Sequence, residues 1–184
     1  MLIRKLLIHE RPLFVAHLKR LTPSDRRFRF AQVHVSDEVI GRYVAGIHVD
    51  DLILGCFTDE HLVGAVHVAF AGDLAEVGVS VDPDHRAQGI GAELFQRAAR
   101  WARNRHAERL YTLCQTDNRA MIALAVKLGM KIHRESGTAE AFLVLAPPDL
   151  LTVSDELSVG MHTVFRDWAD VMRTCRGMWL PGRS

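Results

Sequence analysis

The residues best suited to chemistry form a short glycine turn, "RAQGIGA", at positions 86–92. An apolar segment precedes the turn, and a segment with helical spacing follows it. Glycines such as Gly89 and Gly91 let a backbone approach a ligand closely, and N–H groups at a helix start bind phosphate oxygens. Arg86 can add a charge-assisted contact to a phosphate. The turn therefore predicts a phosphate cradle made of Arg86, Ala87, Gln88, Gly89, Ile90, Gly91 and Ala92.

Two common phosphate-binding motifs do not fit this turn. A dinucleotide-binding turn would read G-x-G-x-x-G, but its third glycine position holds Leu94. The chain also lacks the G-x-x-x-x-G-K-[ST] pattern of a P-loop. A different phosphate-bearing ligand is the favoured interpretation of the cradle. The alternatives are a strand-to-helix turn that merely needs glycine and, more weakly, a dinucleotide-binding protein.

A candidate general base lies on the segment that leads into the turn. Glu76 is the lone acid in "LAEVGVSV", and an acid among apolar neighbours is suited to accept a proton near neutrality. A solvent-facing strand residue or an ion-pair partner is the alternative interpretation of Glu76. His67 and His85 are rival bases, although an ordinary strand histidine and an exposed loop histidine are the favoured interpretations of them.

Composition excludes several other classes of function. The 184 residues are 48% hydrophobic and 24% charged, with a formal net charge of +1, which gives no reason to expect nucleic acid or an anionic membrane as partner. The three cysteines, Cys56, Cys114 and Cys175, form no CxxC pair, and the histidines are scattered, so we expect no disulfide framework and no metal site. No apolar run is long enough to span a membrane. We therefore expect a soluble cytoplasmic protein.

The elements that must position these residues follow from periodicity. Short β-rich segments with tight turns predict an antiparallel meander before the glycine turn. The predicted strands cover 2–8, 51–57, 61–71, 74–82, 109–115, 130–135 and 140–147. The predicted helices cover 12–21, 36–47, 89–105 and 118–128, and the polar stretch 22–35 is predicted to be irregular.

The chain divides near Pro147 and Pro148. We expect one domain over residues 1–148 and a helical extension over 149–184, whose apolar stripe includes Leu157, Phe165 and Trp168. The stripe could pack on its own domain, form a dimer contact or lie on a membrane surface. Its mixed charges suit lipid least, and we predict a homodimer.

Two stretches of the chain resemble one protein family. "VSVDPDHRAQGIGAEL" is similar to the acyl-CoA pyrophosphate motif [Q/R]-x-x-G-x-[G/A] of the GNAT (Gcn5-related) N-acetyltransferases, with the match on Arg86, Gly89 and Gly91. "NRAMIALAVKLGM" (118–130) resembles the family's N-x-x-A-x-x-x-Y-x-K-x-G-F segment. The order of elements agrees over about 2–146, and several short stretches look closest to bacterial protein lysine acetyltransferase domains. The fold implied is α/β (α+β): a mixed, mostly antiparallel sheet flanked by helices, with the C-terminal amphipathic helix appended.

The resemblance implies a function and a set of roles. It implies an acetyl-CoA-dependent N-acetyltransferase that acts by direct attack in a ternary complex and uses no metal. The backbone of Val79, Ser80 and Val81 would hold the pantetheine arm, Asn118 would position that arm or a water, and Glu76 would be the general base, directly or through water.

Two questions stay open at the level of sequence. Ala125 replaces the tyrosine that many family members use as general acid, so no general acid is assigned. The acceptor is either a protein lysine or the amine of a small molecule or peptide. A non-catalytic acyl-CoA-binding sensor is the alternative function.

Overall fold

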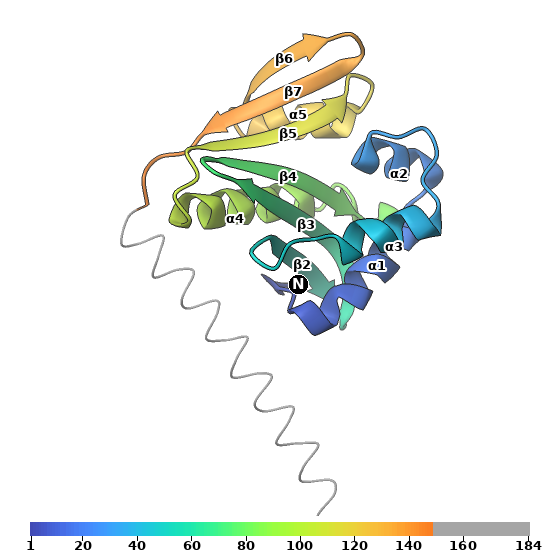
Figure 1. Ribbon diagram of the computed structural model, residues 1–184. Helices are drawn as coiled ribbons and strands as arrows, with labels where there is room; N and C mark the ends of the chain where they lie inside the picture. Colours follow the sequence, from blue (N-terminus) through green and yellow to red (C-terminus); the bar gives the residue numbers. More distant parts are fainter. Residues whose placement is uncertain (149–184) are drawn as a thin grey trace, which may run out of the picture.

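One seven-stranded sheet forms the frame of the molecule (Figure 1). The computed structural model describes residues 1–148, and the predicted helical extension lies outside them. The strands follow the spatial order β1-β2-β3-β4-β5-β7-β6. Their bounds are β1 Leu2–Lys5, β2 Leu52–Thr58, β3 His61–Ala71, β4 Leu74–Val81, β5 Arg109–Gln115, β6 Lys131–Glu135 and β7 Thr138–Val144.

The sheet is split at its centre. All strand pairs are antiparallel except β4 and β5, which run parallel and are in register only at Leu74↔Arg109, Ala75↔Leu110 and Glu76↔Tyr111. Beyond Glu76 the two strands pair no further, so the end of β4 has an edge without a neighbouring strand. The mixed, mostly antiparallel sheet and the meander β2-β3-β4 confirm the predicted fold class.

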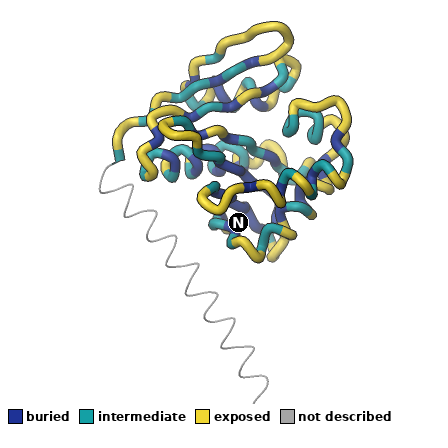
Figure 2. Tube along the Cα trace, in the orientation of Figure 1, coloured by how far each residue is buried: buried dark blue, intermediate teal, exposed yellow. Residues whose placement is uncertain are grey.

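Helices cover both faces of the sheet (Figure 1). They are α1 Arg11–Arg20, α2 Pro23–Phe30, α3 Asp37–Ala45, α4 Ile90–Asn104 and α5 Arg119–Lys127, with short 3-10 turns η1 at Ile8–Glu10 and η2 at Pro83–His85. One apolar core lies between the sheet and α4 and α5, and a second lies between the sheet and α1 and α3. Figure 2 shows this burial concentrated along the central strands and the helix sides that face them.

The helix α2 corrects our expectation that residues 22–35 are irregular. Thr22 caps it by accepting a hydrogen bond from the Asp25 N–H at 3.2 Å, and Pro23 occupies the first turn. No residue of α2 is buried. The helix therefore carries no apolar stripe for periodicity to detect, although "TPSD" is a recognisable helix start.

Several strand bounds also differ from the prediction by one to three residues, chiefly in the first and last strands. The first strand ends at Lys5 and not at residue 8, because η1 begins at Ile8 and Glu10 accepts a hydrogen bond from the Leu7 N–H at 2.9 Å. The last strand begins at Thr138, two residues earlier than expected, and pairs there with Gln115.

Candidate active site

The glycine turn has the backbone that a phosphate cradle needs. Gly89 has φ +81°, a left-handed conformation that favours glycine, and it stands at the N-cap of α4 without any side-chain cap. The first N–H groups of α4 are therefore left for a ligand. Gly91 has a different role: a Cβ there would lie 3.7 Å from Val81 Cγ2, so the protein itself has room for it. Gly89 allows the left-handed backbone conformation of the turn, and Gly91 leaves space beside the helix start for a ligand.

The free edge of β4 continues from this cradle. The Asp82 N–H donates to the Val63 carbonyl on β3 at 2.8 Å. Because successive peptide groups of a strand alternate in direction, Val81 and Val79 direct their backbone groups away from β3 and toward the gap beside β5. Ser80 directs its backbone to β3. Of the three residues predicted to hold the pantetheine arm, Val79 and Val81 offer backbone groups and Ser80 does not.

A cavity of about 870 Å³ joins the cradle, this free edge and α2. It brings together nearly all of the residues that the sequence singled out. Those lining it are Glu76, Val79, Ser80, Val81, Arg86, Ala87, Gly89, Ile90, Gly91, Ala92 and Asn118. Gln88 is the exception: it is exposed, and its amide donates to the Asp84 carbonyl at 3.5 Å.

Glu76 reaches the cavity but is not surrounded by apolar side chains, which corrects our expectation. Strand alternation places its neighbours Ala75 and Val77 in the core on the opposite face of the sheet. Glu76 itself is exposed and lines the cavity. Within residues 1–148 its carboxylate forms no ion pair and no hydrogen bond. The carboxylate is therefore available to an amine.

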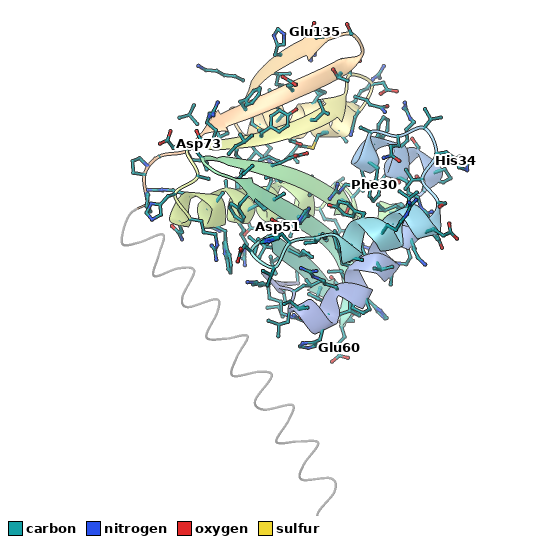
Figure 3. All side chains as sticks on the ribbon, in the orientation of Figure 1. Phe30, His34, Asp51, Glu60, Asp73 and Glu135 are labelled. Atoms are coloured by element: carbon teal, nitrogen blue, oxygen red, sulfur yellow. The ribbon has the colours of Figure 1, made fainter. Side chains whose placement is uncertain are left out.

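His67 is held by two partners rather than free to act as a base. Its Nδ1 lies 2.7 Å from Tyr43 Oη, and its Nε2 lies 3.2 Å from Asp51 Oδ2. Burial, followed by the nearby positive charge of Arg29, lowers the pKa of His67 to about 4. The ring is therefore neutral at physiological pH. Asp51 and Phe30, both labelled in Figure 3, lie on the sheet face that carries α3.

Arg29 is the cation at this end of the cavity, and the sequence analysis did not single it out. The residue comes from α2, and its Nη2 donates to Tyr43 Oη at 2.6 Å. The guanidinium lies against the backbone of Gly78 on β4, where any side chain would collide with it. Its Nε is buried without a hydrogen-bond partner. Asp51, His67, Tyr43 and Arg29 thus form a continuous polar chain that ends in the cavity.

The helix α2 is tied to both arms of the split sheet. Arg27 donates to Gln115 Oε1 at 2.5 Å and to Asp117 Oδ2 at 2.6 Å, beside the end of β5. On the other side, Asp25 pairs with Arg86 of the glycine turn at 2.6 Å. Arg86, predicted to contact a phosphate, pairs with Asp25 and also lines the cavity, and its contact to a phosphate stays a prediction.

A second polar cluster joins α1 to the end of β4. His17 is fully buried, with Nε2 2.9 Å from Ser80 Oγ and Nδ1 2.9 Å from Asp82 Oδ1. Asp82 also pairs with Arg20 at 2.9 Å. Burial alone would raise the pKa of Asp82, but the hydrogen bonds with His17 and Arg20 outweigh it and lower that pKa. This cluster positions the end of β4, which leads into the cradle. The sequence around His17 contains no pattern that predicts these contacts.

The remaining candidates lie as follows. Asn118 caps α5 by accepting from the Met121 N–H at 3.1 Å, as expected, and it also lines the cavity. Ala125 is only 1% exposed and packs in the core. Burial raises the pKa of the Cys114 thiol, which suits an ordinary core cysteine. His85 lines the cavity beside Arg86, at the cradle end.

Two features are absent from residues 1–148. No group of three or more His, Cys, Asp or Glu side chains in this range could hold a metal ion. No helix in the same range is both long and apolar enough to cross a membrane.

Comparisons with known proteins agree with this arrangement. The model of the "Acetyltransferase (GNAT) family" matches residues 18–130, more than half of the chain. The chain belongs to the GNAT acetyltransferase family. A search of the curated proteins finds no match.

Solved structures share the GNAT fold. The GNAT domain of PAT from S. lividans is 21% identical, with a TM-score of 0.67 over 78% of this chain and 89% of that chain. The PaiA N-acetyltransferase from Thermoplasma acidophilum, in complex with coenzyme A, is 18% identical, with a TM-score of 0.61 over 78% and 98%. The structure of yncA from Salmonella typhimurium with its cofactor acetyl-CoA is 19% identical, with a TM-score of 0.59 over 82% and 98%.

Proposed function

We propose that the protein transfers the acetyl group of acetyl-CoA to an amine by direct attack in a ternary complex. One observation carries this proposal. A single cavity contains an open helix start, a free strand edge and an unpaired carboxylate, in that order along β4. Coenzyme A or acetyl-CoA bound to two of the solved GNAT structures supports the same cosubstrate.

The chain's residues divide the work of the reaction. The first N–H groups of α4 bind the pyrophosphate, and Val79 and Val81 bind the pantetheine arm and polarise the thioester carbonyl. Glu76, directly or through a water, takes a proton from the ammonium form of the acceptor. Glu76 passes that proton to solvent. The amine nitrogen then bonds to the carbonyl carbon, the C–S bond breaks to release the thiolate, and the nitrogen loses its second proton to Glu76 or water.

The leaving sulfur does not require the tyrosine that Ala125 replaces. A thiol is acidic enough to leave as thiolate and take its proton from solvent. In this fold position 125 packs in the core and is absent from the cavity lining. Asn118, at the start of α5, is the residue of that helix placed to position the pantetheine arm or a water. A homodimer stays a prediction.

Release of free thiol from acetyl-CoA, measured with a panel of amines, tests the proposal. Glu76→Gln should lower kcat by about 100-fold or more, the range of general-base catalysis, and leave the affinity for acetyl-CoA within about twofold. Glu60→Gln, on the exposed turn before β3, is the matched control and should behave as wild type. Binding of acetyl-CoA without turnover of any amine would instead favour the non-catalytic sensor.

A further inference from the structure

The cavity is lined by two opposite charges, Arg29 and Glu76, that do not pair with each other. Within the described residues 1–148, neither the Arg29 guanidinium nor the Glu76 carboxylate forms an ion pair, with each other or with any other group. Both side chains line the cavity. The Arg29 Nε is buried without a hydrogen-bond partner, which is costly unless a ligand supplies an acceptor.

The two charges lie on the same face of one strand. Glu76 projects from this face of β4, and the Arg29 guanidinium covers Gly78, two residues further along. Alternate residues of a strand are about 6.6 Å apart. A small molecule with a cation and an anion separated by a few bonds can therefore meet both groups at once.

A chain of hydrogen bonds holds the Arg29 side chain in place. Its Nη2 is held by Tyr43, which His67 holds in turn, and Asp51 holds His67. The Phe30 and Tyr43 rings lie 5.5 Å and 5.3 Å from the guanidinium carbon. No carboxylate takes part at the Arg29 end of this chain of contacts, and the buried Nε still lacks an acceptor. A planar carboxylate is the partner that a guanidinium fork binds best.

We infer that the acceptor is a small amine that carries its own carboxylate close to the amino group, that is, a free amino acid or a molecule of that class. Arg29 binds the carboxylate, and Glu76 binds and deprotonates the amine. This inference rests on the proposed acetyltransferase function and narrows its acceptor. Polyamines and aminoglycosides would place a second cation against Arg29, and a lysine within a folded protein would leave Arg29 unpaired.

Matched acceptors test this inference. The panel consists of the free amino acids and, for each, the carboxamide in which the carboxylate alone is replaced. Thiol release should show kcat/KM about 30-fold or more in favour of the free acid, as expected for a charge-assisted bidentate contact. The preference should be largest for one or a few amino acids.

Variants locate the source of that preference. Arg29→Gln should reduce kcat/KM for the best free acid far more than kcat/KM for its carboxamide, so that the ratio of the two falls toward one. Arg29→Lys should retain part of the preference, because it keeps the charge and loses the fork. Arg42→Gln, an exposed residue of α3 outside the cavity, is the matched control and should change nothing.

The outcomes separate this inference from the proposed function. Turnover of carboxamides, peptides or polyamines at the same rate as free acids would refute the inference and leave the acetyltransferase intact. If Arg29→Gln lowered kcat/KM equally for acid and carboxamide, Arg29 would act on the thioester and not on the acceptor carboxylate. That result would also refute the inference. Thiol release that no amine stimulates would refute the proposed function and this inference together. If Arg29→Gln does not fold, the ratio of kcat/KM for the free acid to kcat/KM for its carboxamide in the wild type still tests the inference.

Discussion

Acidification should destabilise the protein through His67, and replacing that residue should remove the effect. The folded protein holds the pKa of His67 at about 4, against 6.5 for an unperturbed histidine. At a pH between these two values, His67 is protonated in the unfolded chain and neutral in the folded chain. This contribution to stability is therefore complete above pH 6.5 and is lost as pH falls toward 4, with a total of about 3 kcal/mol of unfolding free energy.

Urea unfolding at pH 7 and pH 4.5, followed by circular dichroism, measures this loss. Other groups titrate in the same range, so the useful quantity is a difference between variants. Wild type should lose between about 2 and 3 kcal/mol more than His67→Gln across this interval, because glutamine does not titrate. His133→Gln, with its side chain 71% exposed, is the control and should follow wild type.

Parallel losses in wild type and His67→Gln would refute the buried, neutral state of His67 and with it the polar chain that holds Arg29. A second measurement tests the cause. The positive charge of Arg29 is the largest contribution after burial that lowers this pKa. The pKa of His67, followed by NMR of its ring protons, should therefore rise in Arg29→Gln.

Two substitutions at the cradle test the remaining contacts. Gly91→Val, which introduces a side chain larger than the glycine or alanine that the family motif accepts at this position, should weaken acetyl-CoA binding at least about tenfold by filling the ligand's space; unchanged affinity by calorimetry would contradict the cradle. His17→Ala should cost about 2–4 kcal/mol in thermal or urea unfolding, because it empties a buried site and strands Ser80 and Asp82; a cost under about 0.5 kcal/mol would contradict this cluster.

Local signals were enough to predict the frame and the glycine turn at the start of α4. The meander, the long helix α4 and the turn with Gly89 all depend on periodicity and turn chemistry within about 20 residues of chain. Asn118 at the start of α5 has the same kind of signal, and the structure confirms it as a helix cap. These features need no knowledge of which strands are neighbours.

Other parts of the cavity depend on contacts between residues that are distant in the sequence. His17 meets Ser80 across 63 positions, and Arg27 meets Gln115 across 88. The helix α2 that brings Arg29 to the cavity buries none of its residues, so its pattern of apolar residues is uninformative. Only the sheet topology shows that this helix faces the gap between β4 and β5.

The alternation of β4 explains why the two ends of the cavity differ. Its odd-numbered residues Val79 and Val81 pack their side chains toward α4 and turn their peptide groups to the gap, which suits a long neutral arm of cofactor. The even-numbered positions place Glu76 and the bare backbone of Gly78 on the opposite face, where Arg29 fills the space. A shift of one residue in the pairing of β4 with β3 would move each side chain of β4 to the opposite face of the sheet and disrupt both ends of the cavity. The antiparallel pairing with β3, continuous over all eight residues of β4, is what holds that register.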